Sequence, residues 1–133
     1  MVGGTFMNVQ VIDPIEYGRV GERPLLATFY RPERTKGKTV PVIVWIHGGA
    51  WWAGDRHGDA DACQHIARHG LACLSIDYRL SQEAIFPAAI EDCKCAVRYL
   101  RAHAADLDIL PGKIGAWGPS AGGHLAALLG TSS

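Results

Sequence analysis

One uninterrupted apolar stretch, Val42–Ile46, constrains the fold of this chain more than any other feature of its sequence. A strand with one solvated face alternates apolar and polar residues, whereas the run from Pro41 to Ile46 contains no polar residue at all. Continuous runs of this kind are typical of strands that are covered on both faces, as in parallel sheets. We therefore expect a buried strand over Pro41–Ile46.

Strand-like and helical patterns alternate around this segment. Before it, Val9–Ile12 and Pro24–Tyr30 are rich in β-forming residues. The turn formers expected to bound these two strands are Asp13-Pro14, Gly18 and Gly21. After it, an apolar stripe at helical spacing predicts a helix over residues 59–69, with Asp59 as its N-cap and Gly70 as its stop.

The same pattern continues to the end of the chain. The elements expected there are a buried strand over residues 71–76, a helix over Ala88–Ala104, a short strand over Lys113–Trp117 and an apolar helix over Ala121–Leu129. Alternation of this kind implies right-handed crossovers between parallel strands. The sequence therefore predicts the α/β class, with a mostly parallel sheet and helices on both faces, in one domain that includes residues 1–133.

Composition excludes several classes of protein. The 13 basic and 13 acidic side chains give a formal net charge of zero, which lacks the basic excess of nucleic-acid-binding proteins. Hydrophobic residues make up 48% of the chain, too many for a disordered segment. No apolar run approaches the roughly 18–20 residues that span a bilayer, and no secretory signal is visible at Met1. We expect a soluble, cytoplasmic domain that binds neither nucleic acid nor membrane.

Four cysteines raise the question of disulfides or a metal site. They are Cys63, Cys73, Cys93 and Cys95. The last two are separated by one residue, which is not the spacing of a CxxC pair, and on a helix their side chains lie about 200° apart. Without a secretory signal, we expect four free thiols that pack as small hydrophobic residues.

A G-x-S-x-G pattern stands at Gly118-Pro119-Ser120-Ala121-Gly122, between a predicted strand and a predicted helix. In that context, a sharp turn lifts the serine hydroxyl above the sheet, and glycines let the backbone pass closely. The helix that begins at Ala121 also points backbone N–H groups at any negative charge that forms there. The pattern alone is only suggestive, and its position between strand and helix makes it a candidate nucleophile site.

A second candidate, His47-Gly48-Gly49-Ala50-Trp51-Trp52, directly follows the central predicted strand. Successive glycines at a strand's carboxyl end allow backbone N–H groups to hold the oxyanion of an acyl-transfer intermediate, typically worth a few kcal/mol per donor. A tight turn that merely requires glycine is the alternative. The serine motif at the end of another strand favours the oxyanion site.

Together the two motifs resemble the α/β-hydrolase fold, and in particular the HGGG-type esterases related to hormone-sensitive lipase. The resemblance covers the chain from about residue 15 to its last residue and leans towards carboxylesterases of the feruloyl- or acetyl-xylan-esterase type. The other segments that match in order and spacing are Asp77-Tyr78-Arg79-Leu80-Ser81, Phe86-Pro87-Ala88-Ala89-Ile90-Glu91-Asp92 and the run from Gly118 to Ala126.

The resemblance implies a role for each motif. Ser120 is the acyl nucleophile, and the oxyanion donors are the backbone N–H groups of Gly49, Ala50 and Ala121. Ala50 replaces the third glycine of the HGGG pattern, which leaves its backbone donor in place if φ stays negative. Trp51 and Trp52 are possible walls of an acyl pocket. No metal or organic cofactor is implied.

The rest of the catalytic triad is missing from this sequence. In this fold the acid and then the histidine follow the nucleophile. After Ser120 there is no Asp or Glu, and the one histidine, His124, lies four residues along the same predicted helix, where it packs rather than reaches the hydroxyl. The resemblance also implies that the sheet continues beyond the strand ending at Trp117, and three further strands need on the order of 90 residues or more. We therefore expect these 133 residues to be the N-terminal portion of a longer esterase, inactive on their own.

Other candidates have simpler explanations. His57, His65 and His69 surround the first predicted helix, and we expect a solvated helix face rather than a metal site. Asp77 precedes the nucleophile, the wrong order for the triad acid, and we interpret it as structural. Near the start of the second long helix, Glu91 and Asp92 meet the helix dipole favourably and need no catalytic role.

The sequence thus predicts serine-dependent hydrolysis of carboxylic esters of small acyl or aryl groups, by the complete protein, through an acyl-enzyme on Ser120. An arylformamidase is the alternative within the hydrolases, because those relatives also carry an HGGxW loop before a serine elbow. A non-catalytic binding module that has lost the triad is the alternative from another class. Acyl specificity and oligomeric state are left open.

Overall fold

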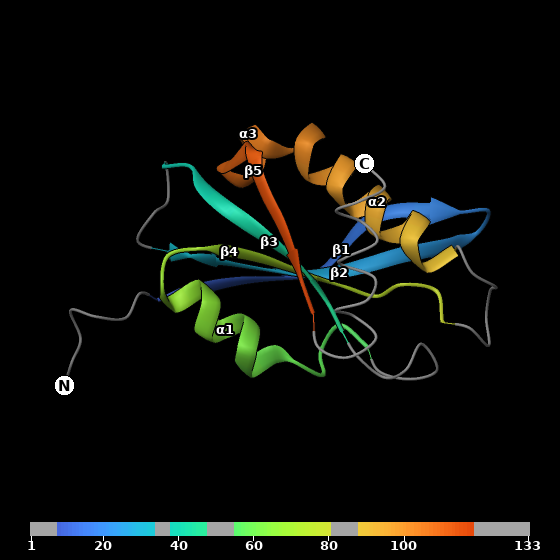
Figure 1. The fold of residues 1–133 in the computed structure, drawn as a ribbon, viewed down its shortest axis with the longest axis horizontal. Coiled ribbons are helices and arrows are strands. Elements are labelled where there is room, and N and C mark those ends of the chain that lie inside the picture. Colours follow the sequence, from blue (N-terminus) through green and yellow to red (C-terminus); the bar gives the residue numbers. More distant parts are fainter. Residues whose placement is uncertain (1–7, 34–37, 48–54, 81–87, 119–133) are drawn as a thin grey trace.

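A five-stranded sheet organises the protein, in the order β1-β2-β4-β3-β5 (Figure 1). The computed structural model describes residues 8–33, 38–47, 55–80 and 88–118. The elements are β1 (Val9–Val20), β2 (Arg23–Pro32), β3 (Val40–Ile46), α1 (Ala60–Arg68), β4 (Ala72–Ile76), α2 (Ala88–Ala102), α3 (Ala104–Leu107) and β5 (Ile109–Trp117). The helix predicted over Ala121–Leu129 lies outside the described residues.

The sheet is mixed, and the α/β class predicted from the sequence is confirmed. Strands β4, β3 and β5 run parallel, while β1 and β2 form an antiparallel hairpin that joins the sheet through β2 and β4. The hairpin is antiparallel because only Gly21 and Glu22 connect its strands, and Gly21 adopts a φ of 58°. The parallel part contains β3, the continuous apolar run, between two neighbours.

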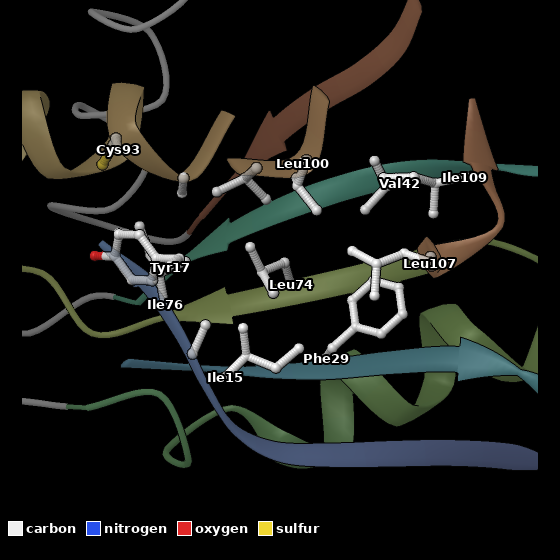
Figure 2. Packing of buried hydrophobic residues seen from close by; sticks show 14 of the residues in the cluster. Ile15, Tyr17, Phe29, Val42, Leu74, Ile76, Cys93, Leu100, Leu107 and Ile109 are labelled. Carbon is white, nitrogen blue, oxygen red and sulfur yellow. The ribbon is translucent and has the colours of Figure 1, made fainter. Parts of the chain in front are cut away.

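Helices cover both faces of the sheet, as predicted (Figure 1). α1 packs on one face, where Cys63 and Ala67 meet Tyr30, Trp45 and Cys73. α2 and α3 cover the other face, and Figure 2 shows the larger core that they enclose with the sheet. Its fully buried members include Phe29, Val42, Leu74, Ile76 and Leu100. β3 is therefore desolvated from both sides, which explains its apolar sequence.

The two N-terminal strands are longer than predicted. β1 continues through Asp13-Pro14 and Gly18 to Val20, and it does so with register irregularities between Ile12 and Ile15 and between Glu16 and Gly18. A β-bulge inserts a residue into one strand without ending the pairing. The residues predicted to stop the strand therefore mark its irregularities.

Helix boundaries differ from the prediction in two places. Asp59 makes no side-chain cap, because its carboxylate accepts a hydrogen bond from Trp45 Nε1 at 2.9 Å. The second long helix ends at Ala102 instead of Ala104, and a separate short helix follows His103. As predicted, α1 ends just before Gly70, which has a φ of 100°.

All four cysteines are free thiols, as predicted. Three are buried in the two cores, and Cys95 is partly buried, with its Sγ 3.5 Å from the carbonyl oxygen of Tyr17. Burial raises the pKa of Cys93 to about 12, with the nearby Asp92 carboxylate adding to the effect. Among the described residues, no helix is long and apolar enough to cross a membrane.

Gly18 tests the packing of α2 on β1. A Cβ at Gly18 would lie 2.5 Å from Cys95 Sγ, so Gly18→Ala forces that sulfur out of its contact with the Tyr17 carbonyl. We expect a loss of about 1–2 kcal/mol in the free energy of unfolding, measured by denaturant titration. Gly112→Ala is the matched control, since a Cβ there meets nothing within 4 Å. Removing the sulfur with Cys95→Ala should cancel most of the Gly18→Ala loss, and an unchanged loss in the double variant would contradict the explanation.

Candidate active site

The carboxyl ends of three parallel strands define the candidate site. β3 lies between β4 and β5, with Ile46 paired to Ile76 and Trp45 paired to Trp117. The residues that follow these strands, His47, Asp77 and Gly118, therefore leave the sheet at the same edge. Ligand sites of α/β proteins form at this edge.

Both motifs singled out in the sequence start here. The predicted oxyanion segment follows His47 at the end of β3, and the predicted nucleophile motif begins with Gly118 at the end of the adjacent β5. The residues to which roles were assigned lie outside the described residues. These are Ser120, Gly49, Ala50, Ala121, Trp51, Trp52 and His124.

His47 is held in place on the oxyanion side. It is 2% exposed, its ring stacks on that of Tyr78 with a centroid distance of 4.3 Å, and its carbonyl accepts a hydrogen bond from Tyr78 Oη at 2.7 Å. Burial raises the pKa of Tyr78, and the nearby Cys93 adds to the effect. The phenol therefore remains a neutral hydrogen-bond donor at neutral pH. The backbone is thus fixed one residue before the glycine pair.

Arg56 occupies the other side of the same segment. Its backbone N–H donates to Asp77 Oδ1 at 2.6 Å, and its carbonyl accepts from Ser75 Oγ at 2.8 Å. Its guanidinium donates to Asp77 Oδ2 at 2.6 Å and to Asp13 Oδ1 at 3.1 Å. Burial alone would lower the pKa of Arg56, but the bonds to Asp77 and Asp13 outweigh it and raise the pKa, so the side chain stays charged.

The Asp77 carboxylate is therefore already engaged with a cation, which agrees with its interpretation as a structural group. Its partner, Arg56, was not predicted from the sequence. A signal was present, because a carboxylate directly after the fully buried strand β4 requires a nearby positive charge. Arg56 and Arg79 both offered one, and only the fold decides between them.

Asp13 joins the same cluster from the irregular part of β1. Its carboxylate accepts from Thr28 Oγ1 at 3.0 Å and from Arg56, and it lies 2.8 Å from His57 Nε2. Burial would raise the pKa of Asp13, but the bonds from His57, Arg56 and Thr28 favour the charged form and lower the pKa below its usual value of 3.8. Folding therefore stabilises this carboxylate.

The lowered pKa of Asp13 predicts an acid-sensitive contribution to stability. Protons bind the unfolded carboxyl more tightly than the folded one, so the contribution is complete above the unfolded pKa and is lost as the pH falls through the folded pKa. We expect Asp13→Asn to lower Tm at pH 7, and the difference from wild type to shrink as the pH falls to about 3. Thermal melts across this range measure it. A Tm difference of equal size at both ends would contradict the assignment.

A buried ion pair joins Arg79, which follows β4, to Asp92 of α2. Asp92 is 0% exposed and accepts from the Arg79 backbone N–H at 2.8 Å and from its guanidinium, including Nη2 at 2.8 Å. Arg79 Nη2 also reaches the Ala88 carbonyl at the start of α2. Asp92 was interpreted from the sequence as a group that meets the helix dipole and needs no catalytic role, and the structure adds that it faces inward and pairs with Arg79.

The described residues contain no cluster of three or more side chains able to hold a metal. His65 on α1 and His69, the C-cap of that helix, are exposed, with ring centroids 4.4 Å apart and His69 Nδ1 2.8 Å from the His65 carbonyl oxygen. His57 is also exposed and pairs with Asp13. The predicted solvated helix face is confirmed for His65 and His69.

Comparison with known proteins gives consistent matches. The BD-FAE family model matches residues 28–133. The carboxylic ester hydrolase LipN of Mycobacterium tuberculosis is 39% identical over 128 residues, which is 95% of this chain and 33% of LipN. Esterase LipQ of the same organism is 36% identical over 120 residues, which is 90% of this chain and 28% of LipQ. The chain thus spans about a third or less of the length of these relatives.

Two solved structures share the fold described above. A bacterial heroin esterase is 35% identical with a TM-score of 0.82, and the match covers 94% of this chain and 39% of that one. The propionate-bound Est2 esterase of Thermogutta terrifontis is 33% identical with a TM-score of 0.79, and the match covers 86% of this chain and 43% of that one.

Proposed function

Because the chain belongs to the α/β-hydrolase carboxylesterases, with its BD-FAE match over residues 28–133, we propose that the complete protein hydrolyses carboxylic esters through an acyl-enzyme on Ser120. One observation supports this proposal most strongly. The strands that lead into the two sequence motifs, β3 and β5, are adjacent and parallel, with Trp45 paired to Trp117. Both motifs therefore start from the same sheet edge, as an acyl-transfer site requires.

In the proposed reaction, the Ser120 hydroxyl attacks the ester carbonyl. Backbone N–H groups of Gly49, Ala50 and Ala121 hold the oxyanion of the tetrahedral intermediate, and removal of one such donor typically costs about 10²–10³-fold in kcat. The alcohol leaves, an acyl-Ser120 ester remains, and water hydrolyses it to release the acid. The proposed reaction also needs a histidine base and an acidic partner, which activate the hydroxyl of Ser120.

We propose short acyl esters as the substrate class. Est2 of Thermogutta terrifontis, a solved structure with this fold, holds propionate in one structure and butyrate in another. Trp51 and Trp52 follow the proposed oxyanion donors directly in the sequence, and large rings there would limit the length of the acyl chain.

Labelling and turnover together test the proposal. The complete protein is treated with a fluorophosphonate and digested, and the modified residue is identified by mass spectrometry. We expect the label on Ser120, with faster turnover of p-nitrophenyl acetate and butyrate than of long-chain esters. Preferred hydrolysis of a formanilide would favour the arylformamidase. A well-folded protein that takes no label would favour the non-catalytic binding module and contradict the esterase.

A further inference from the structure

We propose that Asp77 is a positioning residue, which holds the proposed oxyanion segment, residues 48–54, at the geometry that the acyl-transfer transition state needs. The inference rests on the proposed function and adds a residue to it. It rests on one observation. Residues at the end of β4 and just after it contact both flanks of that segment, His47 on one side and Arg56 on the other.

Three residues at or just after the end of β4 make polar contacts with these flanks. Ser75 binds the Arg56 carbonyl, the Asp77 carboxylate binds the Arg56 backbone N–H and guanidinium, and Tyr78 binds the His47 carbonyl. Two of these bonds fix both backbone polar groups of Arg56, and a third fixes the backbone carbonyl of His47. His47 before the segment and Arg56 after it are therefore both held by residues at one strand end.

The end of β4 is itself held firmly enough by its neighbours to fix the position of Arg56. Every residue of β4 is buried, and β4 is hydrogen-bonded on both sides, to β2 and to β3. The Asp77 backbone N–H donates to the Leu26 carbonyl at 2.8 Å, and its carbonyl accepts a hydrogen bond from Tyr17 Oη. Asp77 is thus bound to the sheet through its backbone and to Arg56 through its side chain.

Asp77 makes the strongest of these contacts. It binds one residue through two charge-assisted bonds of 2.6 Å, and its side chain is only 20% exposed, while that of Arg56 is 14% exposed. Charge-assisted bonds are about twice as strong as neutral ones, and partial burial reduces screening by solvent. Asp13 holds the same guanidinium from β1, at 3.1 Å, so the Asp77 bond to the backbone N–H is the contact that no other described residue duplicates.

Positioning of this kind affects the transition state more than substrate binding. Backbone donors of an oxyanion hole act on charge that develops during the reaction, so their displacement lowers kcat while the ground-state complex changes little. A displacement near 1 Å costs up to about 100-fold in rate. A residue with a purely structural role would lower stability and leave kcat per folded molecule unchanged.

The test compares three variants of the complete protein with wild type in ester hydrolysis. We expect Asp77→Ala to lower kcat by about 10- to 100-fold with KM within about twofold. Asp77→Asn keeps an acceptor for the Arg56 N–H, so we expect a smaller fall in kcat. Asp108→Asn is the matched control, because Asp108 pairs with Arg31 at 3.1 Å just before β5, at the opposite end of that strand from Gly118. Its kcat should equal that of wild type.

A double-variant cycle separates coupling from general damage. Arg56→Ala removes the guanidinium but keeps the backbone N–H that Asp77 binds, so we expect a smaller fall in kcat than for Asp77→Ala. If Asp77 acts through Arg56, the double variant should fall no further than Asp77→Ala alone, rather than by the product of both effects. Asp77 variants with wild-type kcat, or independent effects in the cycle, would overturn the inference while leaving the esterase in place. An inactive, unlabelled wild type would instead overturn the proposed function, and this inference with it. If Asp77→Ala does not fold, Asp77→Asn still decides the question. A fall in its kcat beyond that of Asp108→Asn supports the inference, and a kcat equal to that of Asp108→Asn overturns it.

Discussion

Replacing Ser120 with alanine is expected to lower kcat of the complete protein by at least about 10⁴-fold, with KM nearly unchanged. The variant has no nucleophile, so no acyl-enzyme forms. Residual hydrolysis above the rate in water would come from the backbone donors and from binding alone. The measurement is turnover of p-nitrophenyl butyrate, together with loss of fluorophosphonate labelling.

His124→Ala is the control for the Ser120 prediction. His124 is the one histidine after Ser120 in this sequence, and we predict that it packs along a helix instead of serving as the base. We expect its kcat to stay within about tenfold of wild type, well above the effect of removing a triad member. Loss of activity as large as that of Ser120→Ala would instead identify His124 as the base.

The largest stability effect is expected at Arg79. Arg79→Met leaves the fully buried Asp92 carboxylate without its cation, and breaking a buried pair from one side typically costs about 3–5 kcal/mol. We expect a loss of that size in the free energy of unfolding, measured by denaturant titration of the complete protein. The loss arises because the carboxylate has been removed from water and has no other described cation within bonding distance.

Two further variants make the Arg79 prediction specific. Arg19→Met removes the exposed pair with Glu16, in which both side chains are more than 40% exposed, and should cost no more than about 1 kcal/mol. Adding Asp92→Asn to Arg79→Met replaces the buried charge with a neutral acceptor and should recover part of the loss. An Arg79→Met variant as stable as Arg19→Met would contradict the assignment.

The order of the elements could be predicted from the sequence because local patterns determine it. Continuous apolarity identified β3 and β4, and helical spacing identified α1 and α2, with the predicted end of α2 two residues too late. Stop signals were less informative. Asp13-Pro14 and Gly18 mark irregularities within β1, since pairing with β2 across the whole hairpin outweighs a local turn preference.

Contacts between distant side chains could not be predicted in the same way. Nothing local indicates that the Asp59 carboxylate binds Trp45 instead of capping its helix, or that Asp92 faces inward. The same holds for Arg56, whose partners come from β1 and from the end of β4. Such pairs depend on strand register, and register is set by the packing of the whole sheet. The predicted roles of Ser120, Gly49, Ala50 and Ala121 stay predictions.

The register of β3 also has a consequence for how the protein folds. Pairing of Val42 with Ala72 closes a loop less than half as long as pairing of Val42 with Ile114. Loop-closure entropy grows with length, and long-range contacts form late. The β3–β4 unit is therefore expected to assemble before β5 docks. A chain emerging from the ribosome would build the flanks of the proposed oxyanion segment before it adds β5, the strand that leads to the nucleophile motif.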